Sequence, residues 1–394
     1  MPKLADRFHA LPGYPLAHVP QRKRELLAAG VDVIDLGAGD ADLPPPRAAI
    51  EALTAAADQP AMHRYGFGLG YVPYREAIVA FMRDRFGLAF DPLKEIVPLL
   101  GSKEGIAHVA LAYLNAGDVA IIPEPGYTPY VGGTVLSEGQ ICKVPLRAER
   151  GFLLDVNEVP ADMARRARIL YLNYPNNPTA AVASREYLQQ VVRWCRERDV
   201  LLVYDNAYSE LAFDTYVPPS IFEIDGARDV AVEFHSLSKT FNMTGWRLGW
   251  AAANAEICAA LAKVKLFVDT GAFMGLQAGG AAALHAWREF VPQNVAQFQA
   301  RRDAAVYAFR QAGFACEVPQ ATMYLWVRLP DGLPSGTFAE RLLEDEGVVV
   351  LPGSGFGAGG EGFFRVSFIC SPARITEAAM RAGRVLAGLA EVAA

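Results

Sequence analysis

Apolar and polar residues follow two rhythms along the chain, and these alternate from about residue 96 onwards. Short, nearly continuous apolar runs predict strands, and apolar residues at three- and four-residue spacing predict helices between several of them, such as 103–114 and 185–198. The strands are predicted at residues 96–100, 119–123, 141–144, 169–173, 201–204, 230–234 and 248–252. Buried strands that alternate with helices are typical of a mostly parallel sheet covered on both faces. Ligands of such sheets bind beyond the carboxyl ends of the strands, so a functional site is expected in the loops that follow them.

The two ends of the chain carry a different pattern. A helix (17–29), a short strand (33–36) and two further helices (46–57 and 73–86) are predicted before the alternation begins. After a helical stretch at 278–312, short strands mix with helices, at residues 324–327, 337–346, 348–351, 363–368 and 373–389. An α/β protein is therefore predicted, with a large domain at 47–290 and a smaller α+β domain formed by 1–46 and 291–394.

Composition narrows the possible partners. The chain has 394 residues, of which 52% are hydrophobic and 20% charged, as in a well-packed globular protein. Its net charge of −6 offers no basic surface for nucleic acid or for an anionic membrane. No apolar run is long enough to span a bilayer, and the N-terminus does not resemble a secretory signal. The five cysteines lack CxxC spacing, so we expect a cytoplasmic protein with neither disulfides nor a metal site.

The loop between the last two strands of the alternating region contains several polar and charged side chains that could take part in binding or catalysis. Ser236 and Ser238 come just before Lys239, and Arg247 follows later in the same loop. At the end of a buried strand a lysine can be desolvated, and it then acts as a nucleophile toward an aldehyde. The hydroxyls and the guanidinium can hold a phosphate. Taken alone, a lysine and an arginine in a loop are more often solvated surface charges.

Four further loops that follow predicted strands carry polar or aromatic side chains. Ser102 opens a predicted helix, whose free backbone N–H groups suit a phosphate, although the serine could be an ordinary helix cap. Asn177 precedes a proline, which restricts the backbone and fixes the direction of the side-chain amide. Asp205 ends a buried strand, where a carboxylate is costly unless it has a partner or caps a helix. Tyr127 could stack on a flat ligand or pack in the core.

An aldehyde partner and a phosphate cradle are the parts needed to hold pyridoxal 5'-phosphate (PLP). The pattern Ser-x-Ser-Lys-x-x-x-x-x-Gly-x-Arg, which ends at Arg247, resembles the cofactor-lysine motif of the class I and II aminotransferases, the fold type I PLP enzymes. Asn177 lies in a run that resembles the family's Asn-Pro-Thr-Gly motif, with Ala180 in place of the glycine. Asp205 and Tyr208 match its Asp-x-x-Tyr motif. The motifs follow the family's order over nearly the whole chain.

The resemblance implies a role for each of these residues. Lys239 would bind the cofactor covalently and then serve as the base that moves the substrate's α-proton. Tyr127 would stack on the pyridine ring, and Asp205 would pair with the ring nitrogen. Asn177 and Tyr208 would contact the phenolic oxygen. The phosphate would be held by Ser102, Lys103, Ser236, Ser238 and Arg247.

The same resemblance extends to the substrate and to a second subunit. Arg365, on a predicted strand with apolar neighbours, would clamp the substrate's carboxylate unless it forms an ion pair. Gly39, Tyr14 and Asn177 would lie close to the same substrate. Tyr65 matches a tyrosine that family members donate to the phosphate of the neighbouring subunit, so a homodimer with shared active sites is expected. An amino acid and a 2-oxo acid would exchange an amino group in a ping-pong reaction.

Within this family, residues 101–105 and 233–247 look most like those of the bacterial LL-diaminopimelate aminotransferases. That similarity implies a place in lysine synthesis, with 2-oxoglutarate as the acceptor. Some of those enzymes carry an acidic residue three positions after the tyrosine that matches Tyr65, where this chain has Gly68. An aspartate, alanine or broad-range aminotransferase therefore stays open. A PLP-dependent carbon–sulfur lyase would share the same cofactor residues.

Overall fold

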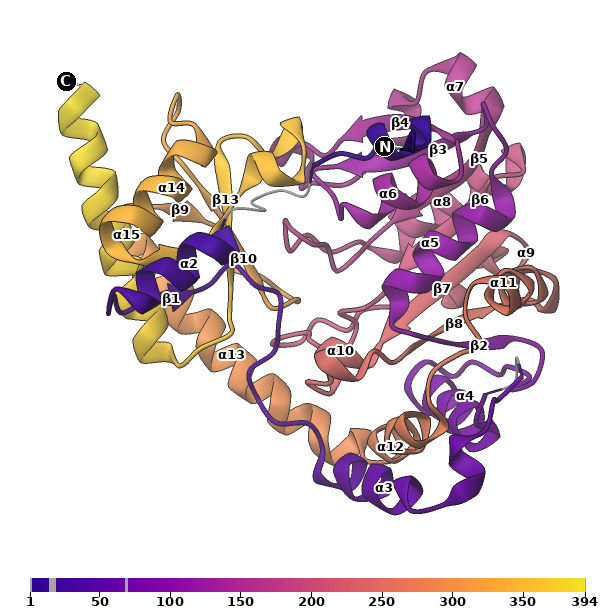
Figure 1. Cartoon of the computed structure of the whole chain (residues 1–394). Coiled ribbons are helices and arrows are strands. Elements are labelled where there is room, and N and C mark those ends of the chain that lie inside the picture. Colours follow the sequence, from indigo (N-terminus) through magenta and orange to yellow (C-terminus); the bar gives the residue numbers. More distant parts are fainter. Residues whose placement is uncertain (1, 14–18, 68–69, 394) are drawn as a thin grey trace.

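A seven-stranded sheet forms the centre of the larger part of the molecule (Figure 1). The computed structural model describes residues 2–13, 19–67 and 70–393 of the chain. The strands of the sheet run in the order β2-β8-β7-β6-β5-β3-β4. They are β2 (Ile96–Leu99), β3 (Val119–Glu124), β4 (Gln140–Pro145), β5 (Ala167–Leu172), β6 (Leu201–Asp205), β7 (Ala231–Ser236) and β8 (Gly249–Ala253). Neighbouring strands are parallel except where β8 pairs with β2 and β7, which confirms the mostly parallel sheet.

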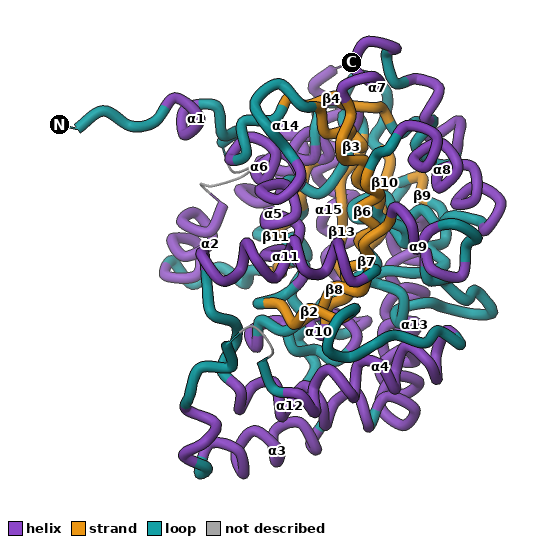
Figure 2. The backbone as a smooth tube through the Cα atoms, turned by 90° about the vertical axis from the view of Figure 1, so that its right-hand side faces the viewer, coloured by secondary structure: helices purple, strands orange, loops and turns teal. Residues whose placement is uncertain are grey.

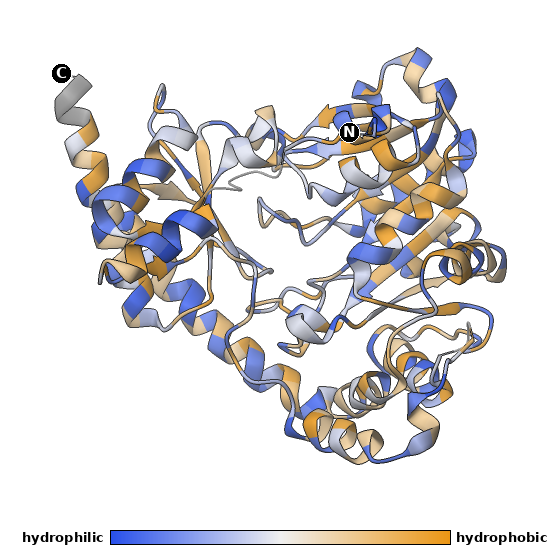
Figure 3. Ribbon diagram, viewed as in Figure 1, coloured by the Kyte–Doolittle hydropathy of each residue, from blue (hydrophilic) through white to orange (hydrophobic). Residues whose placement is uncertain are grey.

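Helices cover both faces of this sheet, as Figure 2 shows. One face packs against α5 (Ser102–Tyr113), α6 (Pro129–Leu136) and α11 (Ala255–Val268), and the other against α4 (Val72–Phe86), α8 (Arg185–Arg198) and α12 (Met274–His285). Leu170 and Leu202 belong to one core, whereas Ile169 and Leu201 belong to the other, because successive side chains of a strand point to opposite faces. The central strands are therefore largely apolar on both faces (Figure 3). The remaining helices of this part are α1 (Asp6–His9), α3 (Arg47–Ala57), α7 (Ala161–Arg166), α9 (Ala227–Val230) and α10 (Leu237–Thr240).

A second, smaller part combines short strands with helices. Its antiparallel sheet has the order β12-β13-β10-β9, formed by β9 (Ala315–Cys316), β10 (Tyr324–Arg328), β12 (Leu351–Pro352) and β13 (Phe363–Ser367). The helices α2 (Val19–Ala28), α14 (Ser335–Glu346) and α15 (Pro372–Ala393) lie around it. The N-terminal segment joins this part, because β1 (Ile34–Asp35) pairs with β11 (Val348–Val349). The single strand predicted at 348–351 is wrong, because the chain changes its pairing partner between β11 and β12.

Helix α13 (Trp287–Gln311) runs from one part to the other. Its residue Val291 belongs to the core of the large sheet, and Phe298 and Ala305 belong to the core of the small one. The helical stretch predicted at 278–312 is two helices, because the chain breaks at Ala286. The predicted boundary at 290/291 falls inside α13, and the division into 47–290 and 1–46 with 291–394 stays a prediction. Neither α13 nor any other described helix combines the length and the apolar character needed to cross a membrane.

The antiparallel strand β8 decides which loops meet at the edge of the large sheet. The carboxyl ends of the parallel strands lie along one edge, and β8 starts at that edge because it runs in the opposite direction. Gly249, at its start, pairs with Leu99 of β2 on one side and with Ser236 of β7 on the other. The segment that leads into β8, including Arg247, therefore lies beside the loops that follow β2 and β7.

Candidate active site

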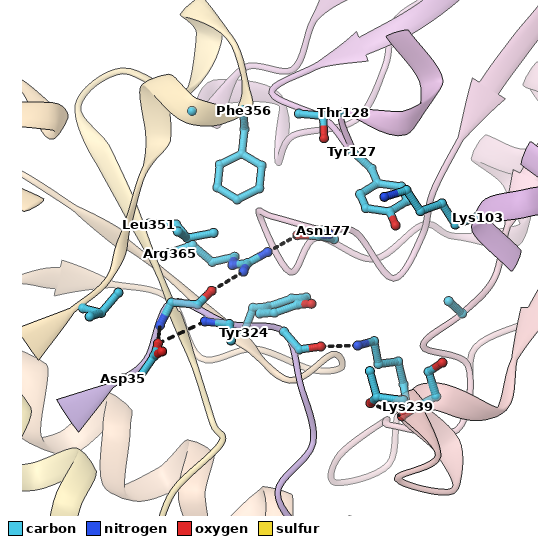
Figure 4. A pocket seen from close by; sticks show the side chains of 18 of the residues that line it. Asp35, Lys103, Tyr127, Thr128, Asn177, Lys239, Tyr324, Leu351, Phe356 and Arg365 are labelled. Atoms are coloured by element: carbon cyan, nitrogen blue, oxygen red, sulfur yellow. Dashed lines mark hydrogen bonds between the residues drawn. The ribbon is translucent and has the colours of Figure 1, made fainter. Parts of the chain in front are cut away.

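A cavity of about 750 Å³ lies between this edge of the large sheet and the small sheet (Figure 4). Most of the residues predicted from the sequence line it. They are Gly39, Ser102, Lys103, Tyr127, Asn177, Asp205, Tyr208, Ser236, Ser238, Lys239, Arg247 and Arg365. The fold thus brings together loops that follow five different strands of the large sheet and the loop that follows β1.

Among the described residues, Tyr65 is a predicted site residue that does not line the cavity. Tyr14 lies outside the described residues. Tyr65 is 68% exposed and its ring lies against that of Phe67, with 5.5 Å between the ring centroids. The predicted contact of Tyr65 with the site of a neighbouring subunit stays a prediction.

Lys239 lies in α10, a single helical turn that begins directly where β7 ends. The hydroxyl of Ser236 caps this turn by accepting a hydrogen bond from the Ser238 N–H at 3.2 Å. The Lys239 Nζ donates to the carbonyl oxygen of Gly39, which belongs to the loop after β1. The half-buried ammonium is therefore held between the large sheet and the N-terminal segment, on the opposite side of the cavity from Arg365 (Figure 4).

The loop after β2 and the segment before β8 form a concave, basic surface. Gly101 has φ +79°, and a Cβ there would lie 2.5 Å from Nη2 of Arg247, so only glycine fits. Arg247 Nη2 donates to the Leu100 carbonyl at 3.4 Å. Gly101 is the N-cap of α5, so the alternative that Ser102 caps the helix is wrong. Neither Lys103 nor Arg247 forms an ion pair within the described chain, so this surface can accept an anion.

Asp205 is a buried carboxylate at the end of β6, and no helix follows it, so it is not a helix cap. Its Oδ2 accepts a hydrogen bond from Tyr130 Oη at 2.9 Å. Its Oδ1 is buried without a hydrogen-bond partner among the described residues. Burial raises the pKa of Asp205 to about 6, although Tyr130, nearby His235 and the Ala207 N–H act to lower it. Such a carboxylate suits a cationic partner in the cavity.

Tyr130 and His235 support Asp205 from inside the core. The Tyr130 ring stacks on Tyr171 with 4.7 Å between centroids, and the His235 ring stacks on Trp250 at the same separation. His235 is 3% exposed and so lies within the core. The sequence did not single out Tyr130, because a tyrosine in the first turn of helix α6 carries no sign of the distant carboxylate that it binds.

Arg365 projects from β13 into the cavity without an acidic partner. Its Nη1 donates to Asn177 Oδ1 and its Nη2 to the Gly37 carbonyl, both at 2.7 Å. Arg365 forms no ion pair with any residue that the structure describes, so the alternative of a structural ion pair is wrong. A buried guanidinium held only by neutral oxygens is suited to bind a carboxylate.

Asn177 is held in turn by its own motif. Its backbone N–H donates to Asn173 Oδ1 at 2.8 Å. Ala180, which stands where the family has glycine, has φ 60° and so adopts the left-handed conformation that glycine favours. The Ala180 N–H still bonds to the Asn176 carbonyl at 3.0 Å, so this turn forms despite the substitution.

Tyr324, which the sequence did not single out, contacts Tyr208 through its hydroxyl and lies beside Arg365 (Figure 4). Its Oη is 3.0 Å from Tyr208 Oη, and both side chains are buried. Burial raises the pKa of Tyr208 well above its usual value. Burial also acts to raise the pKa of Tyr324, but the charges of Arg365 and Lys239 lower it overall. Tyr324 sits in an apolar strand, where its pattern is that of a core residue.

Gly39→Ala is expected to lower kcat/KM at least about 10-fold, because small displacements of reacting groups are costly. A Cβ at residue 39 would collide with Tyr324 Oη, so either Tyr324 or the loop that holds Lys239 must move. Steady-state kinetics of the purified variant measure this effect. Gly336→Ala is the control, because a Cβ there meets nothing within 4 Å. Equal kinetics for Gly39→Ala and the unmodified protein would contradict the close approach.

One group of possible metal ligands occurs among the described residues, on α5 and at the end of α11. It consists of Glu104, His108 and Asp269. Lys265 Nζ lies 2.5 Å from Glu104 Oε1 and 3.0 Å from Asp269 Oδ1, so an ammonium already takes the place of a cation. Burial acts to raise the pKa of Glu104, but His108 and Lys265 lower it to about 2. This network ties α11 to the first turn of α5.

An aminotransferase needs a catalytic lysine, a buried carboxylate and an arginine without an acidic partner. This cavity, at the edge of a parallel sheet, contains a candidate for each of them. The model of the family "Aminotransferase class I and II" matches residues 31–381. The chain therefore belongs to this family, whose members in general depend on PLP, and it is an aminotransferase. The expected family and fold class are both confirmed.

Relatives within the family carry more specific names. The chain is 44% identical to the LL-diaminopimelate aminotransferase of Moorella thermoacetica over 382 residues, which cover 97% of this chain and 98% of that protein. The substrate-bound structure of BacF from Bacillus subtilis has a TM-score of 0.94, with 32% identity over 98% of both chains. The probable N-succinyldiaminopimelate aminotransferase of Thermus thermophilus has a TM-score of 0.89, with 36% identity over 94% of this chain and 99% of the other.

Proposed function

We propose that the cavity holds PLP on Lys239 and moves the amino group of LL-diaminopimelate to 2-oxoglutarate in the cytoplasm. The observation that carries the proposal is that, besides the basic surface of Lys103 and Arg247, the cavity contains three further groups without an ion-pair partner among the described residues. These are the ammonium of Lys239, the carboxylate of Asp205 with its buried Oδ1, and the guanidinium of Arg365. The name of the Moorella relative supports diaminopimelate as the donor.

The residues present fit the chemical parts of PLP. Asp205 Oδ1, buried and without a hydrogen-bond partner among the described residues, suits the protonated nitrogen of the ring. The basic surface around Gly101 suits the phosphate, because Lys103 and Arg247 line the cavity there and form no ion pair with any described residue. Tyr127 would cover the ring, and Asn177 and Tyr208 would contact its phenolic oxygen. The phosphate contacts are assigned to Ser102, Lys103, Ser236, Ser238 and Arg247.

Bound PLP supplies an electron-withdrawing ring that makes the α-proton of an attached amino acid acidic. Asp205, whose Oδ2 is fixed by Tyr130, would keep the proton on the ring nitrogen. Arg365 would bind the substrate's carboxylate in a bidentate manner, beside Gly39 and Asn177. Lys239 Nζ would take up the α-proton of the substrate and then release it to the cofactor.

A homodimer with shared sites is part of the proposal. Tyr65, with Phe67 at 75% exposure beside it, presents an aromatic surface that faces no residue of its own cavity. Mass measurement in solution is expected to give twice the chain mass. Tyr65→Phe is expected to weaken PLP binding roughly 10-fold, as for loss of one hydrogen bond to a charged group, without changing the measured mass. A fully active monomer would contradict the shared site.

A half-reaction screen tests the proposed substrate. Each amino acid is mixed with the PLP-bound protein. The absorbance of the bound cofactor is followed as it changes from its aldehyde to its amino form. Conversion by LL-diaminopimelate supports the proposal. Conversion by alanine or aspartate but not by diaminopimelate would support a broad-range enzyme instead. Release of ammonia from cystathionine without an oxo acid would indicate a carbon–sulfur lyase.

The broad-range alternative has an observation in its favour. Gly68 stands where some LL-diaminopimelate aminotransferases have an acidic residue for the distal ammonium. The two similar solved structures also carry names other than LL-diaminopimelate aminotransferase. The screen therefore includes amino acids without a distal ammonium.

A further inference from the structure

Arg365 is held between two aromatic rings. Its Cζ lies 4.1 Å from the centroid of the Tyr324 ring and 5.0 Å from that of the Phe356 ring. Figure 4 shows Phe356 on one side of the guanidinium and Tyr324 on the other. The Phe356 carbonyl also accepts a hydrogen bond from the Gly126 N–H at 3.1 Å, which ties this ring's segment to the loop after β3.

Tyr324 is the more firmly fixed of the two rings. It is 2% exposed and belongs to the core of the small sheet, whereas Phe356 is half-buried in a glycine-rich loop. Tyr324 and Arg365 lie on adjacent, antiparallel strands, in which Leu325 pairs with Val366. The ring therefore occupies a set position relative to Arg365 before any ligand binds.

The hydroxyl of Tyr324 points away from Arg365 toward a second group of residues. It lies 3.0 Å from Tyr208 Oη. It also lies so close to Gly39 that a Cβ there would collide with it, and the Gly39 carbonyl accepts the hydrogen bond from Lys239. The Tyr324 ring thus contacts Arg365, which is expected to bind the substrate. The Tyr324 hydroxyl contacts Tyr208, which is expected to contact the cofactor.

We propose that Tyr324 is a positioning residue for the transamination, with two separable roles. Its ring fixes the plane of Arg365 for the substrate's carboxylate, and its hydroxyl fixes the direction of Tyr208. Both roles rest on the proposed function of the same cavity. A long arginine side chain that is already oriented loses less conformational freedom when it binds a carboxylate, so the ring contributes to substrate affinity.

The two roles predict different effects for two substitutions at the same position. Tyr324→Phe keeps the ring and removes the hydroxyl. KM is expected to stay within about 2-fold, while the pH midpoint of the cofactor's absorbance change shifts by at least about half a unit. Tyr324→Leu removes the ring as well. KM for the amino acid is expected to rise about 3- to 30-fold, the effect of losing a cation–π contact, with a smaller change in kcat.

The charged and titratable groups around the Tyr324 side chain determine the pH readout. They are Tyr208 from the segment after β6, Lys239 from α10, Arg365 from β13 and Asp205 from β6. None of them is changed by the substitutions. A residue that only filled space would leave the absorbance midpoint in place, because the bulk of the ring is kept in Tyr324→Phe.

Two further variants complete the experiment. Phe356→Leu removes the second ring from a half-buried site, and it is expected to raise KM in the same direction as Tyr324→Leu. Tyr307→Phe removes a hydroxyl from a tyrosine that is 69% exposed on α13, and it is expected to change nothing. Thermal unfolding of each holoenzyme identifies variants that fail to fold.

Binding of propionate, a carboxylate without an amino group, gives a readout that does not depend on turnover. Its dissociation constant, measured from the absorbance of the bound cofactor, is expected to rise in Tyr324→Leu and Phe356→Leu but not in Tyr324→Phe. An unchanged constant in Tyr324→Leu, or an unchanged midpoint in Tyr324→Phe, overturns the corresponding role. A colourless or inactive unmodified protein would instead overturn the proposed function of the cavity.

Discussion

Transamination by the Lys239→Ala protein is expected to fall by at least about 10³-fold, the scale of losing a positioned general base. The fold places Lys239 beside the Gly39 loop and across the cavity from Arg365. A coupled assay of oxo-acid formation with the purified variant measures the loss, and the variant's absorbance spectrum shows whether PLP is still bound covalently.

A matched control separates loss of chemistry from loss of charge. Lys263→Ala removes an exposed lysine on α11 and is expected to leave the rate within about 2-fold, as for most surface substitutions. The Lys239→Ala chain should unfold at nearly the same temperature as the unmodified apoprotein, because the lost hydrogen bond to Gly39 is only partly buried. Retention of more than about a tenth of the rate would remove Lys239 from its catalytic role.

The sequence predicts the site best where chemistry follows directly after a strand. Ser102, Asn177, Asp205 and Lys239 all come at or just beyond the carboxyl ends of strands, and the ends of parallel strands meet at one edge of a sheet. An apolar run followed by a polar residue is visible in the sequence, so these residues can be found before the fold is known. The cavity confirms that they come together.

The site residues that the sequence does not reveal lie in a different kind of local structure. Tyr324 lies within an apolar strand, Phe356 lies in a glycine-rich 3-10 turn and Tyr130 lies in helix α6, and each reaches the site only through tertiary packing. Their local patterns are those of core or loop residues. The same reason explains the strand predicted at 348–351, because periodicity indicates a strand but does not indicate its partner.

Asp205→Asn is expected to stabilise the apoprotein at pH 8 and to weaken the holoenzyme. In the folded apoprotein the pKa of Asp205 is raised by burial to about 6, above its usual value of 3.8. The folded state therefore binds this proton more tightly than the unfolded state. The stabilising effect of the proton is complete below about pH 4 and is lost as the pH rises through about 6. Asparagine keeps a neutral side chain at every pH, so it avoids this loss.

The expected gain for the Asp205→Asn apoprotein at pH 8 is on the order of 3 kcal/mol, since each unit of pKa shift corresponds to about 1.4 kcal/mol. The gain should shrink toward zero as the pH is lowered to about 4, which denaturant unfolding at several pH values measures. Asp331→Asn, at an exposed position, is the control. With PLP bound, the Asp205→Asn protein should instead be less stable than the unmodified one, because the carboxylate then has a cationic partner. PLP affinity should fall at least about 10-fold in the variant. An Asp205→Asn apoprotein that is less stable than the unmodified one at pH 8 would show that the carboxylate already has its partner without the cofactor.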